Sequence, residues 1–251
     1  MSLRSIAEDI YAKRLLAGLK HIPTHIAVIQ DGNRRYAKAH DISTAEGHRL
    51  GADTTLKVID WMGQIGIKHV TLYAFSTENF RRSSDEVTAL MELFIEKFTA
   101  MLTDKRIVDK KINVTVIGDR SLIPASVLAS IEKIEQATKE NDNYFIHIAI
   151  AYGGRNEITE AARRIVSDVR AGILSADEIS AESITNAMYP AHDMPPVDLI
   201  IRTANDRRTS NFLPWLANGS EAAVCFCTPT WPEFRFVDLA RALRVYDERC
   251  R

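Results

Sequence analysis

An aspartate followed by a glycine and two arginines stands at the end of the first apolar run of the chain. The run His25–Gln30 continues into Asp31-Gly32-Asn33-Arg34-Arg35. Gly32 permits a tight turn, and arginines carry forked donors that match the oxygens of a phosphate. A carboxylate repels an anion, so Asp31 makes sense where a divalent cation lies between it and a phosphate. The segment therefore predicts a site that binds a phosphate and a metal ion together.

Two later apolar runs are followed by similar clusters of polar and basic residues. After His69–Phe75 the chain reads Ser76-Thr77-Glu78-Asn79-Phe80-Arg81-Arg82, and the run Val197–Arg202 is followed by Arg207, Arg208 and Ser210. A single arginine of this kind is most often a solvated surface residue. Three arginine-rich clusters in corresponding places instead predict several phosphate groups. The chain has neither a Walker A sequence nor a G-x-G-x-x-G pattern, which argues against nucleoside triphosphate hydrolysis and dinucleotide binding.

The elements that must position these clusters are short apolar runs that alternate with segments of helical spacing. Nearly continuous apolar character is typical of parallel strands that are covered on both faces. The alternation predicts an α/β fold, a single domain with a central, mostly parallel six-stranded sheet flanked by helices. In such sheets ligands bind beyond the carboxyl ends of the strands, which is where the three clusters stand. The expected strands are His25–Gln30, His69–Phe75, Ile112–Ile117, Phe145–Ala151, Val197–Arg202 and Ala222–Cys227.

Helical spacing is clearest between Asp85 and Leu102, where apolar residues recur at steps of three and four and Ser84 is the expected N-cap. Met1–Lys20 is predicted to form an amphipathic helix. Two interpretations of that helix stay open: it docks on the domain, or its basic residues bring it to a membrane surface. Further helices are expected at Ala52–Gln64, Ala125–Thr138, Asn156–Val169 and Val237–Val245.

Composition narrows the classes of protein. The 251 residues are 46% hydrophobic and 26% charged, and the net charge of −1 gives no overall field that would attract nucleic acid. Cys225, Cys227 and Cys250 are too few for a disulfide framework, and the first two lack histidine partners for zinc, so buried thiols in a reducing compartment are expected. Without a secretory signal or an apolar stretch of about 20 residues, a cytoplasmic location is predicted.

Long motifs recur in order over nearly the whole chain. They are His25-Ile-Ala-Val-Ile-Gln-Asp-Gly-Asn-Arg-Arg-Tyr-Ala-Lys, Glu46-Gly-His-Arg, Thr71-Leu-Tyr-Ala-Phe-Ser-Thr-Glu-Asn-Phe, Ala151-Tyr-Gly-Gly-Arg, Asp198-Leu-Ile-Ile-Arg-Thr, Arg208-Thr-Ser-Asn-Phe-Leu and Trp231-Pro-Glu-Phe. Together they resemble cis-prenyltransferases, the family of the undecaprenyl and dehydrodolichyl diphosphate synthases. The Asn-Arg-Arg-Tyr-Ala-Lys variant is more similar to archaeal and eukaryotic members than to typical bacterial ones.

The resemblance implies an enzyme that joins isopentenyl diphosphate to an allylic prenyl diphosphate, with Mg²⁺ as cofactor. It also implies a homodimer in which the sheet and two helices enclose a hydrophobic tunnel. Asp31 would hold Mg²⁺ and assist ionisation of the allylic substrate, with Asn79 at the reaction centre and Glu221 as a second metal contact. The allylic diphosphate would be bound by Gly32, Asn33, Arg34, Arg35, Tyr36 and His48. Isopentenyl diphosphate would be bound by Arg202, Arg208 and Ser210. A mobile loop would be lined by Phe75, Ser76, Thr77, Glu78, Phe80 and Arg82.

The tunnel implied by the resemblance needs an apolar lining. The helix Val87–Leu102 can supply it together with Leu50, Leu56 and Ile59, although apolar helix faces more often pack a core. Ala74 is small, and the candidates for the closed end of the tunnel are Phe94, Phe98 and Ile146.

The chain also departs from the family pattern. Thr44 stands where many members carry an arginine, and we expect Arg35, Arg49 or Arg82 to supply the missing charge. The other departures are Ala204-Asn205-Asp206, Pro214 and Asn218-Gly219-Ser220.

Three alternatives to a polyprenyl synthase stay open. The first is a short-chain or non-head-to-tail prenyltransferase of the same fold, which the departures allow. The second is a non-catalytic subunit of a two-component enzyme, against which the intact Asp31 motif argues. The third is a Mg²⁺-dependent phosphohydrolase, against which Asn33 argues because such enzymes carry a second aspartate there.

Overall fold

The computed structural model describes residues 3–188, 194–218 and 221–251. Six strands form one sheet in the order β3-β4-β2-β1-β5-β6, and every pairing between neighbours is parallel. The predicted α/β fold with a parallel six-stranded sheet is thereby confirmed. Met1, Ser2, Gly219 and Ser220, which belong to the predicted N-terminal helix and to one of the departures from the family pattern, lie outside the described residues.

The strands lie close to their predicted positions. Five of the six differ from the expected bounds by one or two residues at an end, and β3 matches them. Each strand contains β-branched residues, which pack well on a pleated surface, and most of them are buried. The strands are β1 (His25–Ile29), β2 (His69–Ser76), β3 (Ile112–Ile117), β4 (Tyr144–Tyr152), β5 (Leu199–Arg202) and β6 (Ala223–Phe226).

Three of the predicted helices are longer in the structure, Ala125–Thr138 matches its prediction, and the N-terminal helix ends at Ala17 rather than at Lys20. The largest extension is at α3, which begins at Thr44 rather than Ala52 because the Ser43 side chain accepts a hydrogen bond from the Glu46 N–H and caps it. The helix predicted from Asp85 begins at Ser84, so Ser83 and not Ser84 occupies the N-cap. The helices are α1 (Leu3–Ala17), α2 (Asn33–Ala39), α3 (Thr44–Ile65), α4 (Ser84–Met101), α5 (Lys105–Asp109), α6 (Ala125–Thr138), α7 (Gly154–Arg170), α8 (Ala181–Ala187) and α9 (Phe236–Arg249).

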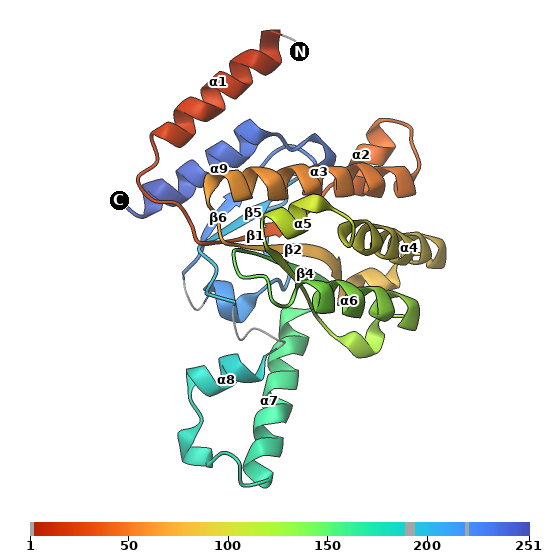
Figure 1. Ribbon diagram of the computed structural model, residues 1–251, viewed down its shortest axis with the longest axis vertical. Coiled ribbons are helices and arrows are strands. Elements are labelled where there is room, and N and C mark those ends of the chain that lie inside the picture. Colours follow the sequence, from red (N-terminus) through yellow and green to blue (C-terminus); the bar gives the residue numbers. More distant parts are fainter. Residues whose placement is uncertain (1–2, 189–193, 219–220) are drawn as a thin grey trace.

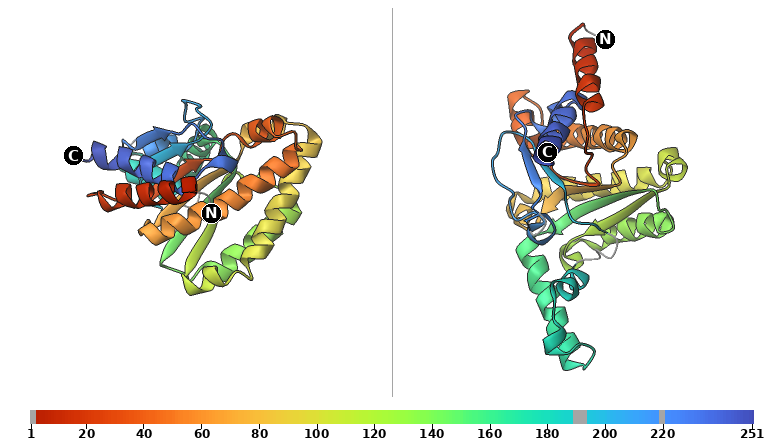
Figure 2. Two further views of the ribbon diagram at one scale, coloured as in Figure 1. Left: turned by 90° about the horizontal axis from the view of Figure 1, so that it is seen from above. Right: turned by 90° about the vertical axis from the view of Figure 1, so that its left-hand side faces the viewer.

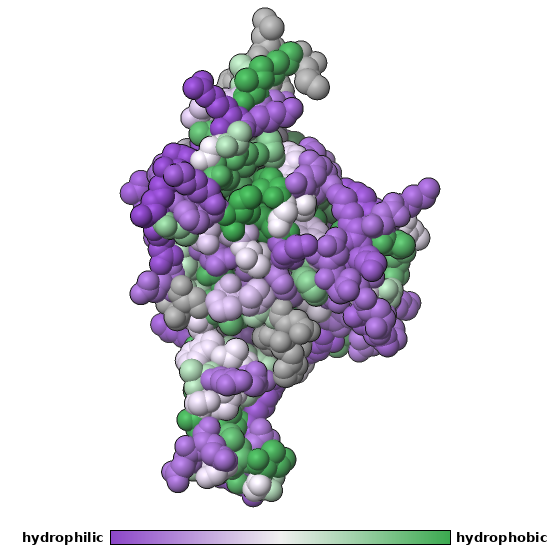
Figure 3. Space-filling model, turned by 60° about the vertical axis from the view of Figure 1, so that its left-hand side comes forward, coloured by the Kyte–Doolittle hydropathy of each residue, from purple (hydrophilic) through white to green (hydrophobic). Residues whose placement is uncertain are grey.

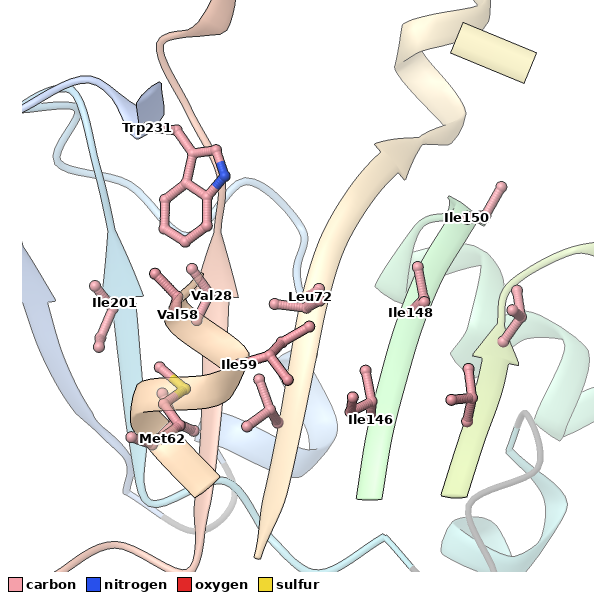
Figure 4. Packing of buried hydrophobic residues seen from close by; sticks show 14 of the residues in the cluster. Val28, Val58, Ile59, Met62, Leu72, Ile146, Ile148, Ile150, Ile201 and Trp231 are labelled. Carbon is pink, nitrogen blue, oxygen red and sulfur yellow. The ribbon is translucent and has the colours of Figure 1, made fainter. Parts of the chain in front are cut away.

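Alternate residues of each strand face two separate apolar layers. On one face Val28, Leu72 and Ile146 pack against α3, whose Ile59 lies over β2 in Figure 4. On the other face Ala27 and Tyr73 pack against residues 212–217. The sheet is therefore buried on both sides, as continuous apolar strands require.

Two segments project from this body. Helix α1 packs against α9 through Ala12, and Figures 1 and 2 show the two helices side by side. Helices α7 and α8 form an arm that extends away from the sheet in Figure 1. In the described part of the chain, no helix is both long and apolar enough to cross a membrane.

Three histidines lie in a row on one face of the sheet. His25 donates through Nδ1 to the Pro195 carbonyl at 2.7 Å, and its Nε2 is 2.7 Å from the Thr71 hydroxyl. His69 Nδ1 lies 3.3 Å from His147 Nε2. Burial, with a smaller contribution from neighbouring imidazoles, lowers the pKa of His25 to about 4 and that of His147 to about 3. The His25 and His147 side chains are therefore neutral in the folded protein at neutral pH.

We predict that this cluster makes the fold sensitive to acid. A histidine whose folded pKa is depressed gives stability that is present above its unfolded pKa of 6.5 and is lost as the pH falls toward the folded value. For His25 alone the free energy of unfolding should fall by roughly 2 kcal/mol between about pH 7 and pH 5. Denaturant titrations at both pH values, on the wild type, on His25→Gln and on His40→Gln as the exposed-histidine control, measure this. An unchanged loss in His25→Gln would contradict the prediction.

Candidate active site

The carboxyl ends of β1, β2 and β5 converge on one polar pocket. Strand β1 lies between β2 and β5, so the direction in which strands are added to the sheet reverses beside it, and open α/β sheets bind ligands at such points. The pocket has a volume of about 540 Å³. Its lining consists of Ile29, Gln30, Asp31, Asn33, His48, Tyr73, Ala74, Ser76, Glu78, Asn79, Arg82, Arg202, Arg208, Ser210 and Asn211.

The backbone of Asp31 is fixed from two sides. Its N–H donates to the Thr203 hydroxyl at 3.0 Å, and the same hydroxyl donates to the Asp31 carbonyl at 2.7 Å. The Trp231 N–H donates to that carbonyl at 2.9 Å. Gly32 follows at φ +106°, and a Cβ there would lie 2.8 Å from the Thr230 Cβ, so only glycine fits this turn. The sequence analysis gave Thr203 no role, because only the pairing of β1 with β5 brings it to Asp31.

The Asp31 carboxylate lies between two arginines. Its Oδ2 is 2.8 Å from Arg202 Nη2, and its Oδ1 is 3.1 Å from Arg35 Nη2. Burial by itself would raise the pKa of Asp31, but the hydrogen bonds and charges of both arginines outweigh it and hold the pKa below its usual value. The aspartate is therefore an anion at neutral pH, as a ligand for a cation must be.

Arg202 organises the second cluster. Only 4% of its side chain is exposed, and it donates to Asp31, to Asp206 at 3.0 Å and to the Ser210 hydroxyl at 2.5 Å. Arg208, whose side chain is 68% exposed, pairs with Asp206 at 2.9 Å and donates through Nε to Ser210 at 3.2 Å. The structure thus brings Arg202, Arg208 and Ser210 together, as predicted, and adds Asp206 as their shared partner.

Two arginines and a histidine surround Glu86, which has no role in the predictions from the sequence. Glu86 Oε1 lies 2.9 Å from Arg82 Nη1 and 3.2 Å from His48 Nε2, and Oε2 lies 3.8 Å from Arg34 Nε. Burial lowers the pKa of His48, the charges of Arg82 and Arg34 lower it further, and Glu86 opposes the shift. The spacing of Arg82 and Glu86 by four residues is the one feature of the sequence that could have indicated their ion pair. The contact with His48 depends on how α3 and α4 pack.

The predicted residues after β2 divide between the polar pocket and the core. Ser76, Glu78, Asn79 and Arg82 line the pocket, and the Asn79 side chain accepts a hydrogen bond from the Ser76 N–H at 3.1 Å. Phe75 is 1% exposed, and its ring lies 4.8 Å from that of Phe80 in an edge-on contact. Thr77 lies against Gly153, where a Cβ would come within 2.8 Å of its hydroxyl oxygen.

Two of the three arginines expected to compensate for Thr44 lie at the site. Arg35 lies beside Asp31 and Arg82 lines the pocket, so both are in place. Arg49 does not contribute its charge to the pocket, because it pairs with Glu96 at 2.8 Å. Tyr36 stacks on His40 with ring centres 3.9 Å apart and does not line the described pocket.

Glu221 is not brought to Asp31 within one chain. It precedes the amino end of β6, whereas Asp31 follows the carboxyl end of β1, so the two lie roughly 20 Å apart along the strand direction. Its side chain is 87% exposed and pairs with Arg249 at 3.3 Å. A metal-binding role for Glu221 therefore stays a prediction.

The donor set fits a metal ion that arrives with a phosphate. Among the described residues, no group of three His, Cys, Asp or Glu side chains could hold an ion by itself. Mg²⁺ in phosphate-processing sites is commonly bound by one or two carboxylates plus phosphate oxygens. Asp31 offers one such carboxylate, surrounded by the arginines that a diphosphate would need.

The polar pocket adjoins an apolar cavity between α3, α4 and the sheet. This cavity, of about 110 Å³, shares Gln30, Asn33, His48 and Ala74 with the polar pocket. Phe94 and Phe98 line it, and a smaller cavity lined by Ile146 and Tyr144 continues beyond Leu56, Ile59 and Met101. The predicted lining residues Leu56 and Ile59 therefore face a hollow and not only a packed core.

Comparisons with known proteins agree with this site. A family model described as putative undecaprenyl diphosphate synthase matches residues 29–251. The chain is 50% identical over 244 residues to a tritrans,polycis-undecaprenyl-diphosphate synthase (geranylgeranyl-diphosphate specific) of Methanosarcina mazei, covering 96% of this chain and 81% of that protein. Identity to the protein of the same name from Archaeoglobus fulgidus is 41%, covering 97% of both chains.

The fold is also that of a solved relative. The crystal structure of lavandulyl diphosphate synthase from Lavandula x intermedia in complex with dimethylallyl diphosphate superposes with a TM-score of 0.85, at 34% identity, covering 92% of this chain and 96% of that one. The predicted similarity to archaeal members is confirmed by the curated relatives. Motifs, sheet topology and these matches show that the chain belongs to the undecaprenyl diphosphate synthase family, the cis-prenyltransferases.

Proposed function

We propose that this protein condenses isopentenyl diphosphate with an allylic prenyl diphosphate in a Mg²⁺-dependent reaction. The observation that carries the proposal is the single pocket around Asp31, which has arginine clusters on two sides and adjoins an apolar cavity. Two diphosphates need two cationic subsites, and a prenyl tail needs an apolar one.

The names of the relatives supply the substrate of choice. The archaeal relatives are named as undecaprenyl diphosphate synthases specific for geranylgeranyl diphosphate. We therefore propose geranylgeranyl diphosphate as the primer and a long-chain polyprenyl diphosphate, the precursor of a lipid carrier, as the product.

The allylic diphosphate is assigned to the side of the pocket formed by Gly32, Asn33 and His48. Arg34, Arg35 and Arg82 add positive charge there, and Arg82 offsets the arginine that is missing at Thr44. Isopentenyl diphosphate is assigned to Arg202, Arg208 and Ser210, whose donors converge on the other side of Asp31. Asp31 stands between the two subsites and would hold Mg²⁺ against phosphate oxygens.

The chemistry follows from where charge develops. When bound, Mg²⁺ supplies a Lewis acid that stabilises negative charge on the departing diphosphate. The arginines and the His48 side chain are fixed before the allylic C–O bond breaks, so they stabilise that charge without reorganising. The double bond of isopentenyl diphosphate then attacks the allylic C1, and a proton is lost. Ser76 and Asn79 at the end of β2 line the region in which the two carbons meet.

Two surfaces support the remaining proposals. Exposed apolar residues at the α7–α8 arm, Val166 (51% exposed) and Ile173 (77%), support a homodimer in which a second copy covers them. Helix α1 docks on α9 but leaves Ile6 and Ile10 exposed at 43% and 63%, which supports contact with a membrane surface. Figure 3 shows hydrophobic side chains along α1 at the top of the view and on the arm at the bottom.

Incorporation of radiolabelled isopentenyl diphosphate tests the function. Purified protein with Mg²⁺ is given dimethylallyl, geranyl, farnesyl or geranylgeranyl diphosphate, and the products are sized by chromatography. A long-chain product formed best from geranylgeranyl diphosphate supports the proposal. Short or branched products would favour the atypical prenyltransferase, and release of phosphate without incorporation would favour the hydrolase. No reaction by folded protein would favour a non-catalytic subunit.

We predict that Asp31→Ala lowers turnover by about 100-fold or more, because it removes a group that acts on the charge of the transition state. Folding should be retained, since Arg202 keeps Asp206 and Ser210 as partners when the Asp31 carboxylate is removed. The incorporation assay and a thermal melt measure the two effects. Near-normal turnover in a folded variant would exclude Asp31 from the reaction centre.

Arg208→Ala should raise KM for isopentenyl diphosphate by roughly 10- to 100-fold, since a charge-assisted hydrogen bond contributes about 1.5–3 kcal/mol. KM for the allylic substrate should change far less. Arg207→Ala is the matched control, because Arg207 is exposed and does not line the described pocket. Equal effects of the two variants on both KM values would refute the assignment of this subsite.

Thr203 is predicted to act as a positioning residue for Asp31. Thr203→Val keeps the shape of the side chain but removes the hydroxyl that contacts both the N–H and the carbonyl of Asp31. We expect kcat to fall by about tenfold, because misplacement by about 1 Å can cost up to 100-fold. KM should stay nearly constant, while the Mg²⁺ concentration for half-maximal activity rises. Thr203→Ser should restore both, and failure of this rescue would refute the role.

A further inference from the structure

Two cysteine thiols meet outside the site described above. Cys225 and Cys227 stand two residues apart on β6 and just beyond it, so they point to the same face of this edge strand. Their sulfur atoms are 3.8 Å apart. Both line an open pocket of about 700 Å³ that lies between β6, α9 and the segment before α9. This pocket shares none of its residues with the catalytic pocket.

The two thiols lie in unequal environments. Cys225 is half-buried and reachable from the pocket, whereas Cys227 is 9% exposed. A hydrogen bond from Cys227 lowers the pKa of Cys225, and the same contact together with burial raises the pKa of Cys227. A more acidic, accessible thiol beside a buried one is the arrangement found in reversible thiol sensors, where the second cysteine resolves the first adduct.

The charged residues of the pocket leave donors for an incoming molecule. Arg235 and Arg241 have side chains 43% and 56% exposed. Both pair with Asp238, and Glu233 accepts a hydrogen bond from the Thr230 hydroxyl at 2.5 Å. The pocket is therefore balanced in charge, yet each arginine still presents N–H groups that can bind the carboxylates of a small peptide disulfide.

The segment that follows Cys225 forms backbone hydrogen bonds with residues of the catalytic pocket. The Cys227 N–H donates to the Arg202 carbonyl at 2.7 Å, and the Cys227 carbonyl accepts from the Asn205 N–H at 2.8 Å. Four residues later the Trp231 N–H donates to the Asp31 carbonyl. A shift of Cys227 is therefore transmitted to Arg202 and to the segment that fixes Asp31.

Closing a bond between the two sulfurs would produce such a shift. Residues two apart on a strand have Cα atoms about 6.6 Å apart. Disulfides span Cα separations of about 4.4–6.8 Å, most often near 5.5–6 Å. A bridge at this position can form but draws the two residues together, and it bends the end of β6 where Cys227 contacts Arg202.

We propose that Cys225 and Cys227 form a reversible thiol–disulfide pair that slows the enzyme when it is oxidised by a low-molecular-weight disulfide. The Cys225 thiolate attacks one sulfur of that disulfide, forming a mixed disulfide and releasing one thiol. The Cys227 thiolate then attacks the Cys225 sulfur and releases the second thiol. Two protein thiols are oxidised, the small disulfide is reduced, and the two protons pass to the leaving thiolates.

The test treats the full-length protein with oxidised glutathione and follows it by thiol titration, intact mass and isopentenyl incorporation. Cys250→Ser serves as the parent, since it removes the exposed third thiol. We expect the parent to lose two thiols and the mass of two hydrogens, and dithiothreitol to reverse both. Turnover should fall by about tenfold, because small displacements in a catalytic site have effects of this size. Cys225→Ala in the same background should form no bridge and keep its turnover.

The thiol readout does not depend on the proposed function, whereas the turnover readout does. A stable glutathione adduct without a bridge, or two thiols that do not react while the protein stays folded by circular dichroism, would overturn the proposed pair. A reversible bridge that leaves the turnover of an active enzyme unchanged would overturn its coupling to the site. Should Cys225→Ala fail to fold, Cys225→Ser replaces it in each arm of the experiment.

Discussion

The ion pair between Asp31 and Arg202 is the interaction on which the rest of the site depends. The two residues are 171 positions apart along the chain, but β1, which precedes Asp31, pairs with β5, which ends at Arg202. A guanidinium as buried as that of Arg202 is tolerated only where it is paired and hydrogen-bonded. Asp31, Asp206 and Ser210 are therefore held in fixed places around it, and the neighbouring Thr203 fixes the Asp31 backbone. Two adjacent strand ends thus position the carboxylate and the Arg202 cluster.

Each arginine of the site pairs with a carboxylate. Asp31 and Asp206 hold Arg202 and Arg208, while Glu86 holds His48 and Arg82. A diphosphate that enters this pocket exchanges one anionic partner of these cations for another and does not meet unpaired charge. This lowers the cost of keeping so many arginines close together, because like charges at short range repel strongly where water is scarce. It also explains why a chain with a net charge of −1 can contain a strongly cationic pocket.

The sequence predicted most of the strands and helices but few of the contacts between residues that lie far apart along the chain. Apolar runs and helical spacing placed all six strands, because burial on both faces leaves a local pattern. The positions of Asp31, Asn79 and Arg202 at or after the ends of predicted strands correctly indicated that the three share one pocket. The contacts of Glu86 with His48 and of Thr203 with Asp31 leave no such pattern, since each joins elements whose distance is set by packing. The place of Glu221 was likewise not predictable, because its match to a family motif does not indicate at which end of the sheet it lies.

The apolar cavities beside the polar pocket are too small to hold a long prenyl chain unless the helices around them move. The two apolar cavities hold about 110 and 30 Å³, whereas a cavity of about 150 Å³ in a protein core holds a single benzene. A prenyl chain of the proposed length therefore needs α3 and α4 to separate. The ion pairs between these helices, Arg49–Glu96 and Lys97–Asp53, are largely exposed and so contribute little to holding them together. Ile59 of α3 and Leu72 of β2 are buried and line the cavity opposite α4. The fold thus keeps the diphosphate end rigid and leaves the hydrocarbon end free to expand.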